Sequence, residues 1–108
     1  MLLVVWHQGQ RAAEYPLPDG SYLIGRWDPN SGAFPQIDLE SVDVHSKVSR
    51  KHAVVERKGD QVTITDLGSL NGTYINRGDR LTEGQPVSIK PGDEIIVGKV
   101  FLKVEADE

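Results

Sequence analysis

The residues best suited to chemistry lie in the short segment Lys47–His52 (KVSRKH), which combines cations, a hydroxyl and an imidazole. Two other segments carry complementary groups. Gly25-Arg26 ends an upstream strand-like run, and 66–73 is a polar, glycine-rich loop with Asn71 in its middle. Guanidinium, hydroxyl and amide groups are hydrogen-bond donors, and the anion that suits this set best is a phosphate. We interpret the three segments as a predicted phosphate site on a β scaffold.

These residues have two other interpretations. Any one of the cations Arg26, Lys47, Arg50 and Lys51, taken alone, is read as a solvated surface charge, because charged residues are mostly exposed; their order in the sequence around a serine and an asparagine favours a site. Ser49 and His52 also resemble a nucleophile and its base, which would make a small hydrolase. No G-x-S-x-G elbow and no motif-positioned acid accompany them, so we expect a binding protein and not an enzyme.

Composition narrows the classes of protein. The chain has 108 residues, a net charge of −4 and no cysteine, which indicates one domain without disulfides or thiolate metal sites. An acidic domain is a poor general ligand for nucleic acid. No apolar run approaches a membrane span, and the apolar opening residues lack the basic flank of a signal peptide. We expect a cytoplasmic protein with no cofactor, no metal, and neither nucleic acid nor membrane as partner.

The elements that must position the site are short strands. Alternating apolar residues, β-branched side chains and closely spaced turn residues occur throughout, whereas no window has a helical apolar stripe. The long polar stretches 26–35 and 40–49 are expected to be loops. This pattern predicts an all-β fold, an antiparallel β-sandwich of about 10–11 short strands. We expect a single domain over 1–108, with its core at about 2–104 and a solvated tail at 105–108. The predicted strands are 1–6, 11–17, 21–25, 36–39, 52–58, 61–66, 73–75, 85–90, 94–97 and 100–104.

With Gly25-Arg26, Ser49-Arg50-Lys51-His52 and Asn71-Gly72-Thr73 in this order on a β-rich chain, the sequence closely resembles a forkhead-associated (FHA) domain. The resemblance runs from about residue 3 to residue 104. It includes Tyr74-Ile75-Asn76 and the stretch 87–95. It implies a sandwich whose loops at one end bind phosphothreonine-containing segments of other proteins in signalling, within a longer multidomain protein.

The resemblance also implies roles for individual residues. A phosphomonoester carries between one and two negative charges and three acceptor oxygens, which guanidinium and hydroxyl groups can bind. An asparagine amide, with a donor and an acceptor, suits a peptide main chain. The resemblance implies that Arg26, Ser49 and Arg50 bind the phosphate. It also implies that Asn71 binds the peptide main chain, with Ser69 and Leu70 beside it in the same loop. Lys47 is implied to contact residues C-terminal to the phosphothreonine. The residues implied to support the site are Gly25, His52, Gly72 and Thr73.

One position departs from the family pattern. Leu70 stands where many members have a serine or threonine, so the pocket lacks one hydroxyl unless Ser69 or a backbone N–H replaces it. This departure keeps a second hypothesis open, a phosphate-independent interaction or assembly module that uses the sandwich faces. Trp6 and Trp27 are expected to be packing aromatics, with a place lining the loop end as the alternative for Trp27. Arg77 and Arg80 are expected to be turn or surface charges.

Overall fold

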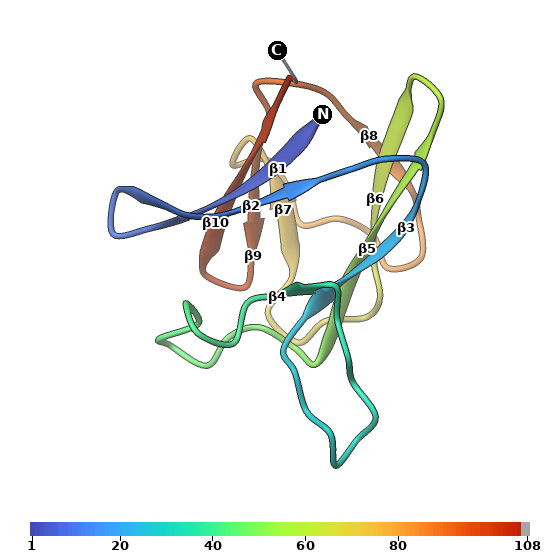
Figure 1. The fold of residues 1–108 in the computed structure, drawn as a ribbon. Helices are drawn as coiled ribbons and strands as arrows, with labels where there is room; N and C mark the ends of the chain where they lie inside the picture. Colours follow the sequence, from blue (N-terminus) through green and yellow to red (C-terminus); the bar gives the residue numbers. More distant parts are fainter. Residues whose placement is uncertain (107–108) are drawn as a thin grey trace.

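The computed structural model describes residues 1–106, in which ten strands and no helix form two facing sheets (Figure 1). The predicted all-β sandwich is therefore confirmed. The first sheet has the order β2-β1-β10-β9-β7 and the second the order β4-β3-β5-β6-β8. Nowhere in this part of the chain is there a helix long and apolar enough to span a membrane. The strands are β1 (Leu2–His7), β2 (Gln10–Pro16), β3 (Gly20–Gly25), β4 (Ile37–Asp38), β5 (Lys51–Lys58), β6 (Gln61–Asp66), β7 (Thr73–Ile75), β8 (Val87–Ile89), β9 (Glu94–Val97) and β10 (Val100–Glu105).

Every strand boundary lies within two residues of the predicted one. β8 begins at Val87, after Pro86, which has no N–H to give to a ladder. β4 runs parallel to β3, because the long loop between them returns the chain alongside β3 in the same direction. Glu105 was expected in the tail but ends β10, where it pairs with Leu2. Residues 107–108 of the expected tail lie outside the described residues.

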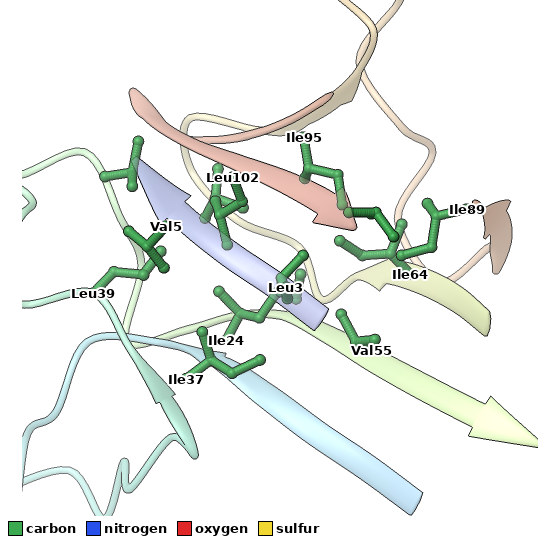
Figure 2. Close-up of a cluster of buried hydrophobic side chains, with 14 of the residues drawn as sticks. Leu3, Val5, Ile24, Ile37, Leu39, Val55, Ile64, Ile89, Ile95 and Leu102 are labelled. Carbon is green, nitrogen blue, oxygen red and sulfur yellow. The ribbon is translucent and has the colours of Figure 1, made fainter. Parts of the chain in front are cut away.

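The core fills the space between the two sheets. Side chains of β1, β9 and β10 meet those of β3, β5 and β6 there, as Figure 2 shows for Leu3, Ile24, Ile64 and Leu102. In β6 burial alternates along the strand, since Val62 and Ile64 are buried while Thr63 and Thr65 are half-buried. Burying such aliphatic side chains stabilises the fold by roughly 1.5–3 kcal/mol each.

Trp27 does not belong to this core. Its side chain is 51% exposed, so the expectation of a packing role was wrong. The reason is its place at the start of the loop between β3 and β4, which extends away from the sandwich at the lower end of the view in Figure 1. Trp6, in β1, is half-buried.

Strand pairing brings the predicted site segments together. β3 and β5 are antiparallel, so the end of β3 at Gly25 lies beside the start of β5 at Lys51. β5 and β6 are also antiparallel, so the end of β6 at Asp66 pairs with Ala53, near the same end of the sheet. The chain then passes through 67–72 into β7 of the other sheet. Three segments distant in sequence therefore meet at one end of the sandwich.

Candidate functional site

Two segments of the chain, the end of β3 and the residues that lead into β5, approach each other closely at Gly25, and the site is built around this point. The Arg26 N–H donates to the Arg50 carbonyl over 3.1 Å, and the ladder shifts register at this point. A Cβ on Gly25 would lie 1.9 Å from that carbonyl oxygen. The glycine is therefore needed for proximity and not for a tight turn, since its φ is not positive. Gly72, in contrast, has a φ of +89°, the conformation that favours glycine in a turn.

Two guanidinium groups extend from this point. The Arg26 Nε–H donates to the Val48 carbonyl over 3.1 Å, and the Arg50 Nε lies 2.5 Å from Asp28 Oδ2. Within residues 1–106, no hydrogen-bond or ion-pair partner is assigned to the terminal Nη groups of either arginine. Both side chains are thus held through Nε while their Nη groups remain available to an anion.

Ser49 lies between these arginines and the loop 67–72. Its Oγ accepts a hydrogen bond from the Leu70 N–H over 3.1 Å, and its own N–H donates to His52 Nδ1 over 3.0 Å. His52 therefore forms a hydrogen bond to the backbone of the segment that carries Ser49. Because His52 meets the backbone of Ser49 and not its hydroxyl, the pair lacks the contact that a nucleophile and its base require.

His52 is fully buried and joins the two loops of the site. Nδ1 accepts a hydrogen bond, so the ring proton lies on Nε2, which donates to the Gly72 carbonyl over 2.8 Å. Burial lowers the pKa of His52 below its ordinary value, and this effect exceeds the opposing influence of the Gly72 carbonyl and the nearby carboxylates. The imidazole is a neutral structural bridge.

The Asp66 carboxylate, at the end of β6, holds the loop 67–72 in place through hydrogen bonds. No role for Asp66 was predicted from the sequence. Its Oδ1 accepts hydrogen bonds from the hydroxyls of Ser69 (2.6 Å) and Thr73 (2.7 Å). Its Oδ2 accepts from the backbone N–H groups of Gly68 and Ser69, over 2.9 and 3.0 Å. Burial acts to raise the pKa of Asp66, but these hydrogen bonds outweigh it, and the pKa lies below its ordinary value.

Ser69 faces into this loop, and Leu70 faces out of it. The Ser69 side chain is 4% exposed; its hydroxyl donates to Asp66 and accepts from the Gly72 N–H over 3.0 Å. The structure thus does not bring this hydroxyl to the surface in place of the one missing at Leu70. The Leu70 side chain is 82% exposed, beside Ser49.

Asn71 and Lys47 are joined across the site. The Asn71 Nδ2 donates to the Lys47 carbonyl over 3.1 Å, so in this structure the amide holds the protein's own main chain. Asp43 holds the same segment from the other side, accepting from the N–H groups of Lys47 (2.8 Å) and Val48 (3.0 Å). Asp43 was missed; a sequence signal for it exists, because an aspartate shortly before such a loop commonly accepts its N–H groups.

The two arginines of the 76–80 turn differ from each other. Arg77 pairs with Glu94 over 2.9 Å and lies over the Phe101 ring, as expected of a surface charge. Arg80 has a further role, because its guanidinium donates to the Ser69 carbonyl and its side chain lies against Gly72. It supports the loop 67–72 from outside the predicted motifs.

Comparison with known proteins agrees with the observed fold. The family profile described as FHA domain matches residues 22–98. The oxoglutarate dehydrogenase inhibitor of Corynebacterium jeikeium is 36% identical over 89% of this chain and 72% of its own length. The FHA domain of the CT664 protein from Chlamydia trachomatis superposes with a TM-score of 0.79 at 27% identity, covering 98% of this chain and 97% of that one.

A second solved structure bears on ligand chemistry. It comes from a structural and functional analysis of phosphothreonine-dependent FHA domain interactions, and it superposes with a TM-score of 0.73 at 26% identity, covering 100% of this chain and 99% of that one. Other curated relatives are longer, and the chain spans 31% to 57% of the length of three of them.

Proposed function

This chain belongs to the FHA domain family, and on that premise we propose that it is a phosphothreonine-dependent module that binds a segment of another protein in signalling. The observation that carries the proposal is the pair of guanidinium groups of Arg26 and Arg50, each held through Nε, on either side of the Gly25 approach. Two such groups supply Nη donors for the three acceptor oxygens and the charge of a phosphate.

The other predicted residues receive roles around this centre. Ser49 supplies a hydroxyl beside the arginines, and Asn71 exchanges its bond to Lys47 for one to the peptide main chain. Leu70 and Lys47 contact residues next to the phosphothreonine, and Ser69 acts through the conformation of its loop. Preference for phosphothreonine over phosphoserine is a family property, and nothing in these contacts sets it.

The supporting experiment is calorimetric titration with a degenerate phosphothreonine peptide library, beside its phosphoserine and unphosphorylated counterparts. We expect the domain to bind the phosphothreonine library alone. The dissociation constant should be micromolar, which corresponds to a binding free energy of about −8 kcal/mol. Arg26→Ala should abolish it, because Arg26 supplies phosphate donors, while Arg77→Ala, which changes an exposed arginine of the 76–80 turn, should not. Retained binding by a folded Arg26→Ala variant would overturn the proposal.

The alternative is a phosphate-independent interaction module, and the exposed Leu70 in place of a hydroxyl favours it. Phosphatase treatment of the partner separates the two functions. Capture that survives the treatment supports the alternative, and capture that is lost supports phosphate recognition. Neither function needs a reaction at Ser49, so we propose a binding protein without catalytic activity. The cytoplasmic location and the longer multidomain context stay predictions.

A further inference from the structure

We propose that Asp28 is a positioning residue for phosphate recognition, which holds Arg50 by its Nε so that the Nη groups point to the ligand. This inference rests on the proposed function. Asp28 lies in the loop between β3 and β4, which the sequence analysis did not include in the site. Its Oδ2 is 2.5 Å from Arg50 Nε.

Asp28 is itself fixed in place, which is what a positioning residue requires. Its Oδ1 accepts the Asn30 N–H over 3.0 Å, and its backbone exchanges two hydrogen bonds with Ala33, each of 2.9 Å. Its side chain is 18% exposed, against 56% for Arg50. A carboxylate held by its own turn therefore restrains a long and otherwise solvated cation.

The other arginine of the site supports this interpretation. Arg26 is held through Nε by the Val48 carbonyl, a backbone group whose position is fixed by the chain. Asp28 does for Arg50 what Val48 does for Arg26. Holding a long side chain in place before the ligand arrives removes part of the entropy cost of binding.

A competing role for Asp28 predicts the opposite sign. A carboxylate beside a phosphate repels it, so if Asp28 only competed for Arg50, its removal would strengthen binding. If Asp28 positions Arg50, its removal weakens binding although a negative charge has been taken away from an anion site. The direction of the change therefore separates the two roles.

The first test compares Asp28→Ala with Asp60→Ala, an exposed aspartate in the β5–β6 turn. Titration with a phosphothreonine peptide that binds the wild-type chain should give a dissociation constant raised about two- to ten-fold for Asp28→Ala. Asp60→Ala should be unchanged. Equal or tighter binding by Asp28→Ala would overturn the proposal.

A double-mutant cycle tests whether Asp28 acts through Arg50 or through the shape of its own loop. In an Arg50→Ala background, Asp28→Ala should cause no further loss, because there is no guanidinium left to position. The same loss in both backgrounds would show that the loop itself contacts the ligand, and the proposal would be wrong.

A measurement without ligand keeps this inference separate from the proposed function. In nitrogen-15 NMR spectra of the free chain, the Arg50 Nε–H should exchange slowly in the wild type and rapidly in Asp28→Ala. If no phosphopeptide binds but this difference is seen, the proposed function fails while the Asp28–Arg50 restraint holds. Fast exchange in both would refute the restraint.

Discussion

Two layers of the loop end have opposite chemistry. The base, defined by Gly25, Asp43, His52, Asp66 and Thr73, is buried, and its polar groups are hydrogen-bonded to the loops above. The rim carries groups that are exposed or open to a ligand. It consists of Arg26, Lys47, Arg50 and Leu70.

The difference between the layers teaches where stability and binding reside. Leaving a buried donor or acceptor without its partner lowers the free energy of unfolding by about 1–3 kcal/mol. Replacing an exposed side chain usually changes it by no more than about 0.5 kcal/mol. Substitutions in the base should therefore unfold the site, and substitutions in the rim should alter binding in a folded domain. Each prediction below tests that division.

The largest effect is expected for Gly25→Ala. The added Cβ would lie 1.9 Å from the Arg50 carbonyl oxygen, so β3 and β5 must move apart. We expect a loss of at least about 3 kcal/mol in the free energy of unfolding, measured by urea denaturation. Gly78→Ala is the matched control, because its Cβ would meet the Ile75 carbonyl oxygen at 3.2 Å and its φ is likewise not positive. Equal stability of the two variants would contradict the close approach.

Asp66→Ala is the next largest change. It leaves two hydroxyls and two backbone N–H groups of the loop without their acceptor. We expect about 3 kcal/mol of destabilisation by urea denaturation. Asp79→Ala, at an exposed turn, should stay within about 0.5 kcal/mol of the wild type. A small effect at Asp66 would show that the loop is held by other contacts.

The ionisation of Asp66 gives this contrast a pH dependence. The pKa of Asp66 is lower in the folded than in the unfolded chain. The stability that the charged Asp66 contributes is therefore fully present above about pH 4 and is lost as the pH falls through the folded pKa. Stability curves of the wild type should therefore fall below pH 4 more steeply than those of Asp66→Asn. Parallel curves for the two proteins would refute the charged state.

A smaller effect is expected at His52, in a higher pH range. Its folded pKa is depressed by burial, so between that value and the unfolded value of about 6.5 the unfolded chain binds more protons. The contribution of neutral His52 to the free energy of unfolding should be fully present above about pH 6.5. It should be lost as the pH falls from there through the folded pKa. His52→Gln should lack this part of the pH dependence. An unchanged slope in the variant would mean that His52 is not the group responsible.

The smallest effect is expected in the rim, at Leu70→Ser. The change adds a hydroxyl beside Ser49 at a position that is 82% exposed. We expect phosphopeptide affinity to rise about two- to ten-fold, the value of one added hydrogen bond, with stability unchanged. Titration and urea denaturation of the same preparation measure both. If stability changes instead of affinity, the division between base and rim is wrong at this residue.

Much of this molecule was predictable because the signals are local. Alternation of apolar and polar residues marked β6 at its observed limits, since side chains alternate between the two faces of any strand. Flanking turn residues marked β7 and β9 at theirs. The order of Gly25-Arg26, Ser49 to His52 and Asn71 to Thr73 identified the family. These features depend on neighbours along the chain and not on the fold.

Other features could not be predicted because they depend on which segments meet. The contacts of Asp28, Asp66 and Arg80 join residues across turns or between strands. The parallel pairing of β4 and the exposure of Trp27 likewise depend on the path of a long loop in space. An aspartate in a polar loop has the same local signal whether it is solvated or accepts four hydrogen bonds. Only the packed loops distinguish the two cases.

The sequence by itself determined the strands, the family and the chemical types at the candidate site, because each is encoded in residue type and short-range spacing. The tertiary structure decided which of those residues are open to a ligand and which support them. It placed Thr73 and His52 in the base and Leu70 in the rim, because antiparallel pairing of β3, β5 and β6 stacks their ends and leaves only the outermost side chains exposed.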